Sequence, residues 1–152
     1  MKSNHLEIIS ETLEDFKCLL SRYKKIKGNY DLRKKFCTRN RNPLWDISSM
    51  SYFKTGLGSI DGLKCDNPVE DHYIQRTKAV DLIFNELEKD PSMSLERFVQ
   101  ILRKYCSVVR LTKYEHSQVT SYCKKNKKVY NYEAYLACGI QIDGLSEIIL
   151  AN

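Results

Sequence analysis

Val69-Glu70-Asp71-His72-Tyr73-Ile74 predicts a short β-strand that ends in an Asp-His pair. A second run, Val108-Val109-Arg110-Leu111, is rich in β-branched residues and predicts another strand. This run continues into Thr112-Lys113-Tyr114-Glu115-His116, where the S/T-x-x-E spacing of a capping box predicts the start of a helix. Because two of the three histidines of the chain fall in these stretches, we expect the stretches to form two halves of one site.

The rest of the sequence predicts helices around these two strands. Apolar residues spaced three and four positions apart predict amphipathic helices over residues 4–25, 77–87 and 95–105. Shorter helices are expected at 30–41, where an ordered basic segment is the alternative, and at 131–138. The apolar segment 140–150 is expected to pack back on the core. A chain of 152 residues has room for one core, so the expected fold is a mostly helical α+β single domain.

Residues 40–43 and 51–66 predict little regular structure. Asn40-Arg41-Asn42-Pro43 is expected to interrupt any helix, and the three glycines between Ser51 and Asp66 indicate a loop or a loose hairpin. Trp45, the single tryptophan, is expected to anchor the core, and stacking on a nucleic-acid base is the alternative.

Positive charge is concentrated in two clusters, within a formal net charge of +6. Such clusters bind phosphates without selecting a sequence, which predicts double-stranded DNA or another polyanion as the partner. A solvated basic face and a surface for an acidic protein are the alternatives. The candidate nucleic-acid-binding residues are Lys24, Lys25, Lys27, Arg33, Lys34, Lys35, Arg39 and Arg41 in the first cluster, and Lys124, Lys125, Lys127 and Lys128 in the second.

Several classes of protein are not indicated. No apolar run approaches the ~20 residues that cross a bilayer, and the start of the chain lacks the apolar core of a signal peptide, so we expect a cytoplasmic protein. No glycine-rich phosphate loop is present, which leaves a nucleotide cofactor without support. The six cysteines contain no C-x-x-C pair and are expected to be reduced thiols, with a zinc knuckle from distant cysteines as the alternative.

Asp71, His72 and His116 carry the residue types that metal-assisted phosphodiester cleavage needs. A carboxylate binds a hard cation such as Mg²⁺ or Mn²⁺, and a neutral imidazole accepts a proton from water near pH 7. Arg76 is expected either to clamp the scissile phosphate or to pair with Asp81 or Glu86. Adjacent strand residues point to opposite faces, so Asp71 and His72 share one ion only at a strand end or a bulge. The structural alternatives are a surface Asp-His dipeptide and a hydrogen-bonded core histidine.

These residues resemble the HNH endonucleases, which have the ββα-metal fold. Asp71-His72 resembles the Asp-His pair of that family, and Thr112 to His116 is similar to the T-x-x-E-N stretch of phage-encoded, homing-type members, with His116 at the Asn position. The resemblance implies that His72 is the general base and that Asp71 and His116 bind one divalent ion. Glu115 is expected to cap the helix. The expected organisation is a helical, basic DNA-contacting part (1–66), a ββα-metal-like core with inserted helices (67–125) and a C-terminal packing segment (126–152).

Two functions from different classes are therefore expected. The first is a metal-dependent DNA endonuclease in a bacterial or phage-infected cytoplasm. The second is a basic nucleic-acid-binding protein that does not catalyse a reaction.

Overall fold

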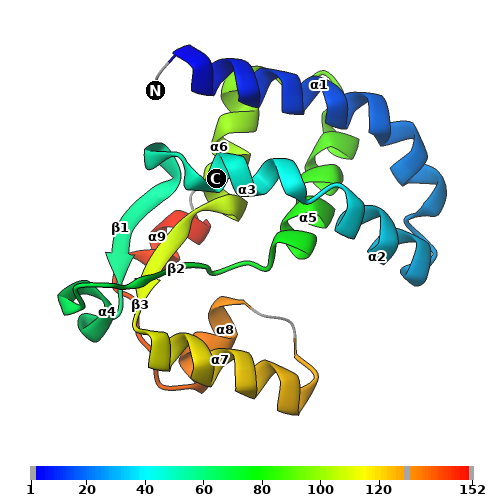
Figure 1. Cartoon of the computed structure of the whole chain (residues 1–152). Helices are drawn as coiled ribbons and strands as arrows, with labels where there is room; N and C mark the ends of the chain where they lie inside the picture. Colours follow the sequence, from blue (N-terminus) through cyan, green and yellow to red (C-terminus); the bar gives the residue numbers. More distant parts are fainter. Residues whose placement is uncertain (1–2, 129–130, 151–152) are drawn as a thin grey trace.

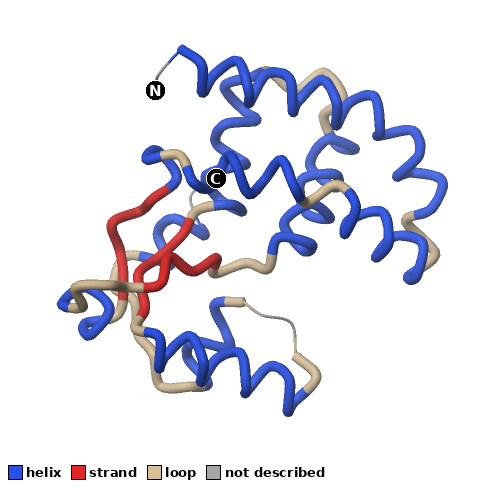
Figure 2. Tube along the Cα trace, viewed as in Figure 1, coloured by secondary structure: helices blue, strands red, loops and turns tan. Residues whose placement is uncertain are grey.

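The computed structural model describes residues 3–128 and 131–150. Residues 129–130 and 151–152 of the expected C-terminal packing segment lie outside the described residues, as do residues 1–2. The fold is the expected mostly helical α+β single domain, in which helices surround one small sheet (Figures 1 and 2).

Five helices form the larger part of the molecule, shown at the top and right of Figure 1. Their apolar stripes face one another, and this packing stabilises them more than intrinsic helix propensity does. Asn29 caps the second helix and Ser94 caps the last one with a side-chain oxygen. The helices are α1 (Ser3–Ile26), α2 (Tyr30–Arg39), α3 (Asn42–Ser49), α5 (Arg76–Lys89) and α6 (Leu95–Cys106).

Aromatic side chains fill the space between these helices. Phe84 of α5 stacks on Phe16 and Tyr23 of α1, with ring centroids 5.0 and 4.9 Å apart, and meets Phe36 of α2 edge-on at 5.0 Å. Such pairs add to the stability that burial of the rings provides. We call this cluster the helical core; its largest members are Ile9, Phe16, Tyr23, Phe36, Leu44, Ile47, Phe53, Ile83, Phe84, Leu87 and Phe98.

The sheet has three strands in the order β1-β3-β2. The strands are β1 (Lys54–Gly58), β2 (Val69–His72) and β3 (Val108–Leu111). β2 runs antiparallel to β3 and places Asp71 opposite Val109 and His72 opposite Val108, whereas β1 runs parallel to β3. The two predicted strands are thus neighbours, although α5 and α6 separate them along the chain.

The lower part of the molecule in Figure 1 covers the sheet with α7 (Lys113–Asn126) and α8 (Tyr132–Ala137). Residues 140–145 add three buried apolar side chains, and the chain then enters α9 (Leu145–Leu150). The expectation that this segment packs on the core is confirmed. We call this second cluster the sheet core; it contains Tyr73, Val109, Leu111, Val119, Cys123, Ala134, Tyr135, Ile140, Ile142 and Leu145.

Close packing of the backbones of β1 and α4 (Ile60–Lys64) supports the side of β3 that does not pair with β2. The 3₁₀ turn η1 (Ser51–Phe53) leads into β1, and α4 follows it. The Ser59 N–H donates to the carbonyl of Arg110 at 3.1 Å. A Cβ at Gly62 would overlap that carbonyl oxygen, and one at Gly58 would lie 2.5 Å from it. Glycine at these positions therefore lets α4 and β1 approach the backbone of β3.

The structure confirms the predicted long helices, the strand Val108–Leu111 and the capping box at its end. The expected interruption at residues 40–43 is present, since α2 ends at Arg39 and a new helix starts at Asn42, whereas the expectation for residues 51–66 is wrong. α3 begins at Asn42 because proline fits the first turn of a helix, where its missing N–H costs nothing. The segment 51–66 contains β1 and α4 instead of a loop or hairpin, since pairing with β3 outweighs the weak local preference of its glycines.

No helix in the described part of the chain is both long enough and apolar enough to span a membrane.

Candidate functional site

Asp71 and His116 lie in contact, although 45 residues separate them along the chain. The Asp71 carboxylate is buried, with 6% of the residue exposed, and one of its oxygens lies 3.1 Å from Nδ1 of His116. The hydroxyl of Tyr135 donates to the other oxygen at 2.5 Å. The His116 side chain is 41% exposed, so it points less fully inward than its helical position suggests. A buried carboxylate thus orients an imidazole that reaches the surface.

The local sequence explains why His116 faces β2. The Thr112 hydroxyl accepts from the N–H of Glu115 at 3.1 Å, and the Glu115 carboxylate accepts from the Thr112 N–H at 2.8 Å. The same carboxylate accepts a hydrogen bond from the Ser59 hydroxyl at 2.8 Å. These bonds fix the start of α7 directly after β3, and the expectation that Glu115 is a capping residue is confirmed.

His72 turns to the opposite side of β2, as the pleat of a strand requires. Its Nε2 lies 2.9 Å from the Ser48 oxygen, and the Ser48 hydroxyl donates to the carbonyl of Trp45 at 3.0 Å. Because a serine hydroxyl has one hydrogen, Nε2 of His72 is the donor in this contact and Nδ1 is the basic nitrogen. Burial, and to a smaller extent the positive charge of Arg76, lower the pKa of His72 to about 4, although the nearby charge of Asp71 acts in the opposite direction. The imidazole is therefore neutral at pH 7.

The two histidines and Asp71 nevertheless border one surface cavity. His72 is the last residue of β2 and lines the same opening as Asp71. The cavity is open and has a volume of about 200 Å³. It is lined by Asp71, His72, Gln75, Arg76, His116 and Thr120.

Arg76 lies on the indole of Trp45, with its guanidinium carbon 3.8 Å from the ring centroid. The expected pairing of Arg76 with Asp81 or Glu86 is not what the structure shows. Asp81 is bound by Arg33 and Lys78, and Glu86 by Lys89. The expectation that Trp45 anchors the core is also wrong, because 55% of Trp45 is exposed; Leu44 and Ile47 fill the core from the same helix instead.

The basic clusters lie at the end of α1 and along α2, and at the C-terminal end of α7. Both α2 and that end of α7 lie toward the right in Figure 1. Two members of the first cluster have structural partners: Lys27 pairs with Glu88 at 2.6 Å, and Arg33 pairs with Asp81 at 3.6 Å. The charges of both clusters remain at the surface, where they attract polyanions.

The residues present suit a divalent ion with few protein ligands. Across residues 3–128 and 131–150, no group of three His, Cys, Asp or Glu side chains is arranged to hold a metal. The 3.1 Å between an Asp71 oxygen and Nδ1 of His116 matches the roughly 3.0 Å between neighbouring ligands of an octahedral ion bound at about 2.1 Å. Mg²⁺ is commonly bound by one or two carboxylates and completes its shell with water and phosphate. The Asp71 carboxylate therefore fits such an ion, and Nδ1 of His116 would have to give up its hydrogen bond to that carboxylate to become a second ligand.

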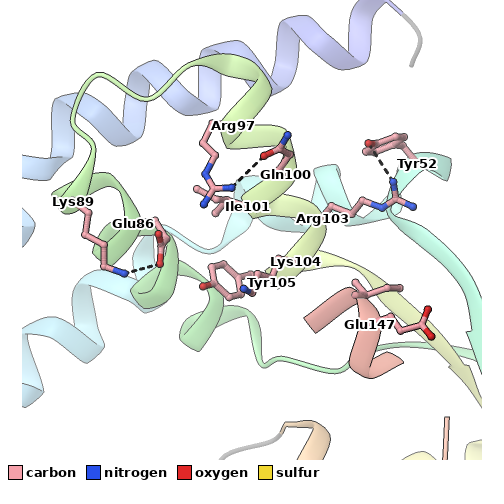
Figure 3. Close-up of a pocket in the computed structure, with 11 residues that line it drawn as sticks. Tyr52, Glu86, Lys89, Arg97, Gln100, Ile101, Arg103, Lys104, Tyr105 and Glu147 are labelled. Carbon is pink, nitrogen blue, oxygen red and sulfur yellow. Dashed lines mark hydrogen bonds and ion pairs between the residues drawn. The ribbon is translucent and has the colours of Figure 1, made fainter. Parts of the chain in front are cut away.

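A larger cavity, of about 540 Å³, lies between α5, α6, η1 and α9 (Figure 3). Its polar side chains mainly satisfy one another. Lys89 bonds Glu86 at 2.9 Å, and Arg97 bonds Gln100 at 3.2 Å. Histidine and cysteine are not among the residues that line it, and it offers no arrangement of acid and base comparable to the pair at Asp71.

Sequence analysis does not predict Tyr135 or Ser48 as part of the site. Tyr135 lies in a short helix that nothing in the sequence connects to Asp71, and Ser48 lies in α3, a helix that sequence analysis does not predict. The six cysteines form no disulfide. For the alternative, a zinc knuckle, the part of the chain described contains no group of three suitable ligands.

Comparisons with protein-family models, with curated proteins and with solved structures give no match to this chain. Its function is therefore argued from the geometry of the site.

Proposed function

We propose that this protein is a metal-dependent DNA endonuclease of HNH type, like the phage-encoded, homing-type members that its motifs resemble, acting in a bacterial or phage-infected cytoplasm. One observation carries the proposal: Asp71 of β2 and His116 of α7 meet at 3.1 Å beside an open cavity whose rim holds His72 and Arg76. An antiparallel strand pair followed by a helix brings these residues together, which is the arrangement that the family resemblance implies.

Each residue has a distinct role in the proposed hydrolysis. Asp71 and His116 hold the divalent ion, and Tyr135 fixes the carboxylate by its hydrogen bond to the second oxygen. When bound, such an ion stabilises negative charge on the phosphate and on the leaving oxygen. Nδ1 of His72 takes a proton from water, the water oxygen bonds to phosphorus, and one ester P–O bond breaks. The departing oxygen receives a proton from solvent.

The low pKa of His72 limits its strength as a base. With a pKa of about 4, the ring is in the neutral form that accepts a proton, but proton transfer to it at pH 7 is less favourable than to an ordinary imidazole. We expect activity to depend on His72 and to depend at least as strongly on His116.

A non-catalytic basic nucleic-acid-binding protein is the second candidate. The observation that favours it is the exposed position of Lys34, Lys35 and Arg39 on α2 and of the lysines that end α7. Such a protein would bind DNA with a strong dependence on salt and would cut nothing.

DNA cleavage in Mg²⁺ or Mn²⁺ tests the proposal. Supercoiled plasmid and long genomic DNA are incubated with the parent, His116→Ala and His72→Ala, and new ends are mapped by sequencing because a homing enzyme cuts few sites. We expect cleavage by the parent and a loss of about 100-fold or more in either variant. His5→Ala, a change far from the site on α1, is the matched control and should cut like the parent.

Two results would contradict the proposal. One is a parent that binds genomic DNA but produces no new ends with either metal. The other is an His116→Ala variant that cuts as fast as the control.

A further inference from the structure

The exposed tryptophan and the arginine on it form a preorganised pair. A guanidinium that lies flat on an indole is held by cation–π attraction and by stacking. At 3.8 Å from the centroid, Arg76 is in close contact with the Trp45 ring. Because Arg76 also lines the cavity of Asp71 and His116, Trp45 fixes a cationic group at the edge of the candidate site.

A second guanidinium, that of Arg41, stands at the start of α3, the helix whose Trp45 carries Arg76. Arg41 is the residue that precedes α3 and is four positions before Trp45, which is about one helical turn. Partial burial lowers the pKa of Arg76, and the positive charge of Arg41 lowers it further. In the described residues, neither Arg41 nor Arg76 has an ion pair with a carboxylate, in contrast to Arg33 and Lys27. Two like charges held near each other without a counter-charge favour an anion between them.

We infer that Arg41, Arg76 and Trp45 form a phosphate-binding subsite for the backbone of DNA next to the Asp71–His116 pair. The N–H groups of a guanidinium match two phosphate oxygens, so Arg76 and Arg41 bind the phosphate while Trp45 positions Arg76. This inference rests on the proposed function for its ligand, DNA, but not for catalysis. The subsite places a backbone phosphate beside the cavity where hydrolysis is proposed.

Binding is measured without metal, so that cleavage plays no part. A fluorescently labelled duplex of about 20 base pairs is titrated in EDTA, and its anisotropy gives Kd at several salt concentrations. We expect Arg76→Ala to weaken binding about 10-fold, as the loss of a charge-assisted contact does. Its slope of log K against log salt should fall by about 0.9, which corresponds to one phosphate contact. Arg22→Ala removes an equal charge from the exposed face of α1 and should change neither value.

Further variants separate charge from position. Arg76→Lys keeps the charge but loses the planar guanidinium and its paired N–H donors. It should therefore bind DNA several-fold more weakly than the parent, with the same slope of log K against log salt. Trp45→Leu should weaken binding similarly and leave Tm within about 2 °C of the parent, since the indole is outside the core. In the parent, fluorescence of Trp45, the single tryptophan, should change on addition of DNA.

The inference is overturned if the parent does not bind the duplex, or if Arg76→Ala and Arg41→Ala match Arg22→Ala in both Kd and slope. It is also overturned if polyglutamate displaces DNA and binds these residues more tightly, because the subsite would then serve an acidic protein. Normal cleavage with unchanged binding in Arg76→Ala removes this inference alone. Altered binding without any cleavage removes only the proposed hydrolysis.

Discussion

The helical part and the sheet part of the molecule each contain one buried aspartate that accepts a tyrosine hydrogen bond. In the helical part, Asp81 is 8% exposed and accepts from the Tyr23 hydroxyl at 2.8 Å. In the sheet part, Asp71 is 6% exposed and accepts from the Tyr135 hydroxyl at 2.5 Å. Burial and the tyrosine are thus shared features, and they do not distinguish a structural carboxylate from a functional one.

The remaining partners distinguish the two. Asp81 is paired with Arg33 at 3.6 Å and Lys78 at 3.2 Å, which are permanent cations that tie α2 and α5 together. Asp71 is paired with the imidazole of His116, which is partly exposed and borders a cavity. A permanent cation neutralises a carboxylate, whereas an imidazole can be a metal ligand and can exchange protons. The site around Asp71 therefore offers chemistry that the site around Asp81 does not.

The same substitution at the two buried aspartates, Asp71 and Asp81, gives the largest expected difference in cleavage. Asp71→Asn should lower metal-dependent DNA cleavage about 100-fold or more, because it removes the charge that holds the ion. Asp81→Asn should leave cleavage within about threefold of the parent but destabilise the fold by about 2 kcal/mol, since it leaves Arg33 and Lys78 unpaired near the helical core. Cleavage assays and urea unfolding of the same preparations measure both effects.

The proposed difference between Asp71 and Asp81 is wrong if the two variants lose cleavage and stability to the same extent. Equal loss of cleavage would mean that Asp71 acts only through stability. Circular dichroism at the assay temperature provides the control that both variants are folded.

The sheet part also differs in relying on close backbone contact, which Gly62 tests. Gly62→Ala should destabilise the protein by about 3 kcal/mol, because the added Cβ overlaps the Arg110 carbonyl and pushes α4 off β3. Gly28→Ala is the matched control: nothing lies within 4 Å of its Cβ, and the change should fall within about 0.5 kcal/mol of the parent. Urea denaturation midpoints compare the two. Similar midpoints would show that α4 does not need this close approach.

The pH dependence of stability gives the smallest expected effect. The folded-state pKa of His72 is about 4, below the value near 6.5 of an unfolded chain. As the pH falls through this window, the unfolded state binds a proton before the folded state does, so stability is lost on acidification from about pH 6.5 to about pH 4. Between pH 7 and pH 5, the parent should lose up to about 2 kcal/mol that His72→Gln does not lose.

Urea unfolding at both pH values measures this difference. If the parent and His72→Gln lose the same stability between pH 7 and pH 5, the neutral, Ser48-bound state of His72 is wrong.

Local sequence predicts the individual helices and strands of this fold better than it predicts which of them lie side by side. Thr112 and Glu115 predict the start of α7 because both partners of a capping box lie within four residues. The prediction that Trp45 anchors the core is wrong for the opposite reason, because its burial depends on which face of α3 packs on α1 and α6. A helix of eight residues has too few apolar positions to show which face this is. β1 fails similarly, because its pairing partner, β3, lies about 50 residues away.

The candidate site likewise contains some residues that the sequence predicts and others that it does not. The pairing of Asp71 with His116 follows from two strands that the sequence indicates, so both residues can be named before the structure is known. Tyr135 and Ser48 come from segments that reach the site only through tertiary packing. The Arg76–Trp45 contact joins α5 to α3, and no local pattern specifies that these two helices meet.

The insertion of α5 and α6 between β2 and β3 has a consequence for how the protein folds. The contact of Asp71 with His116 closes a loop of 45 residues, and ordering such a loop costs entropy that only the packing of α5 and α6 on α1 can offset. Long-range strand pairing of this kind forms slowly. We therefore expect a newly made chain to acquire its helices early and the contact between Asp71 and His116 last, so that the candidate site is completed only after the helical part has folded.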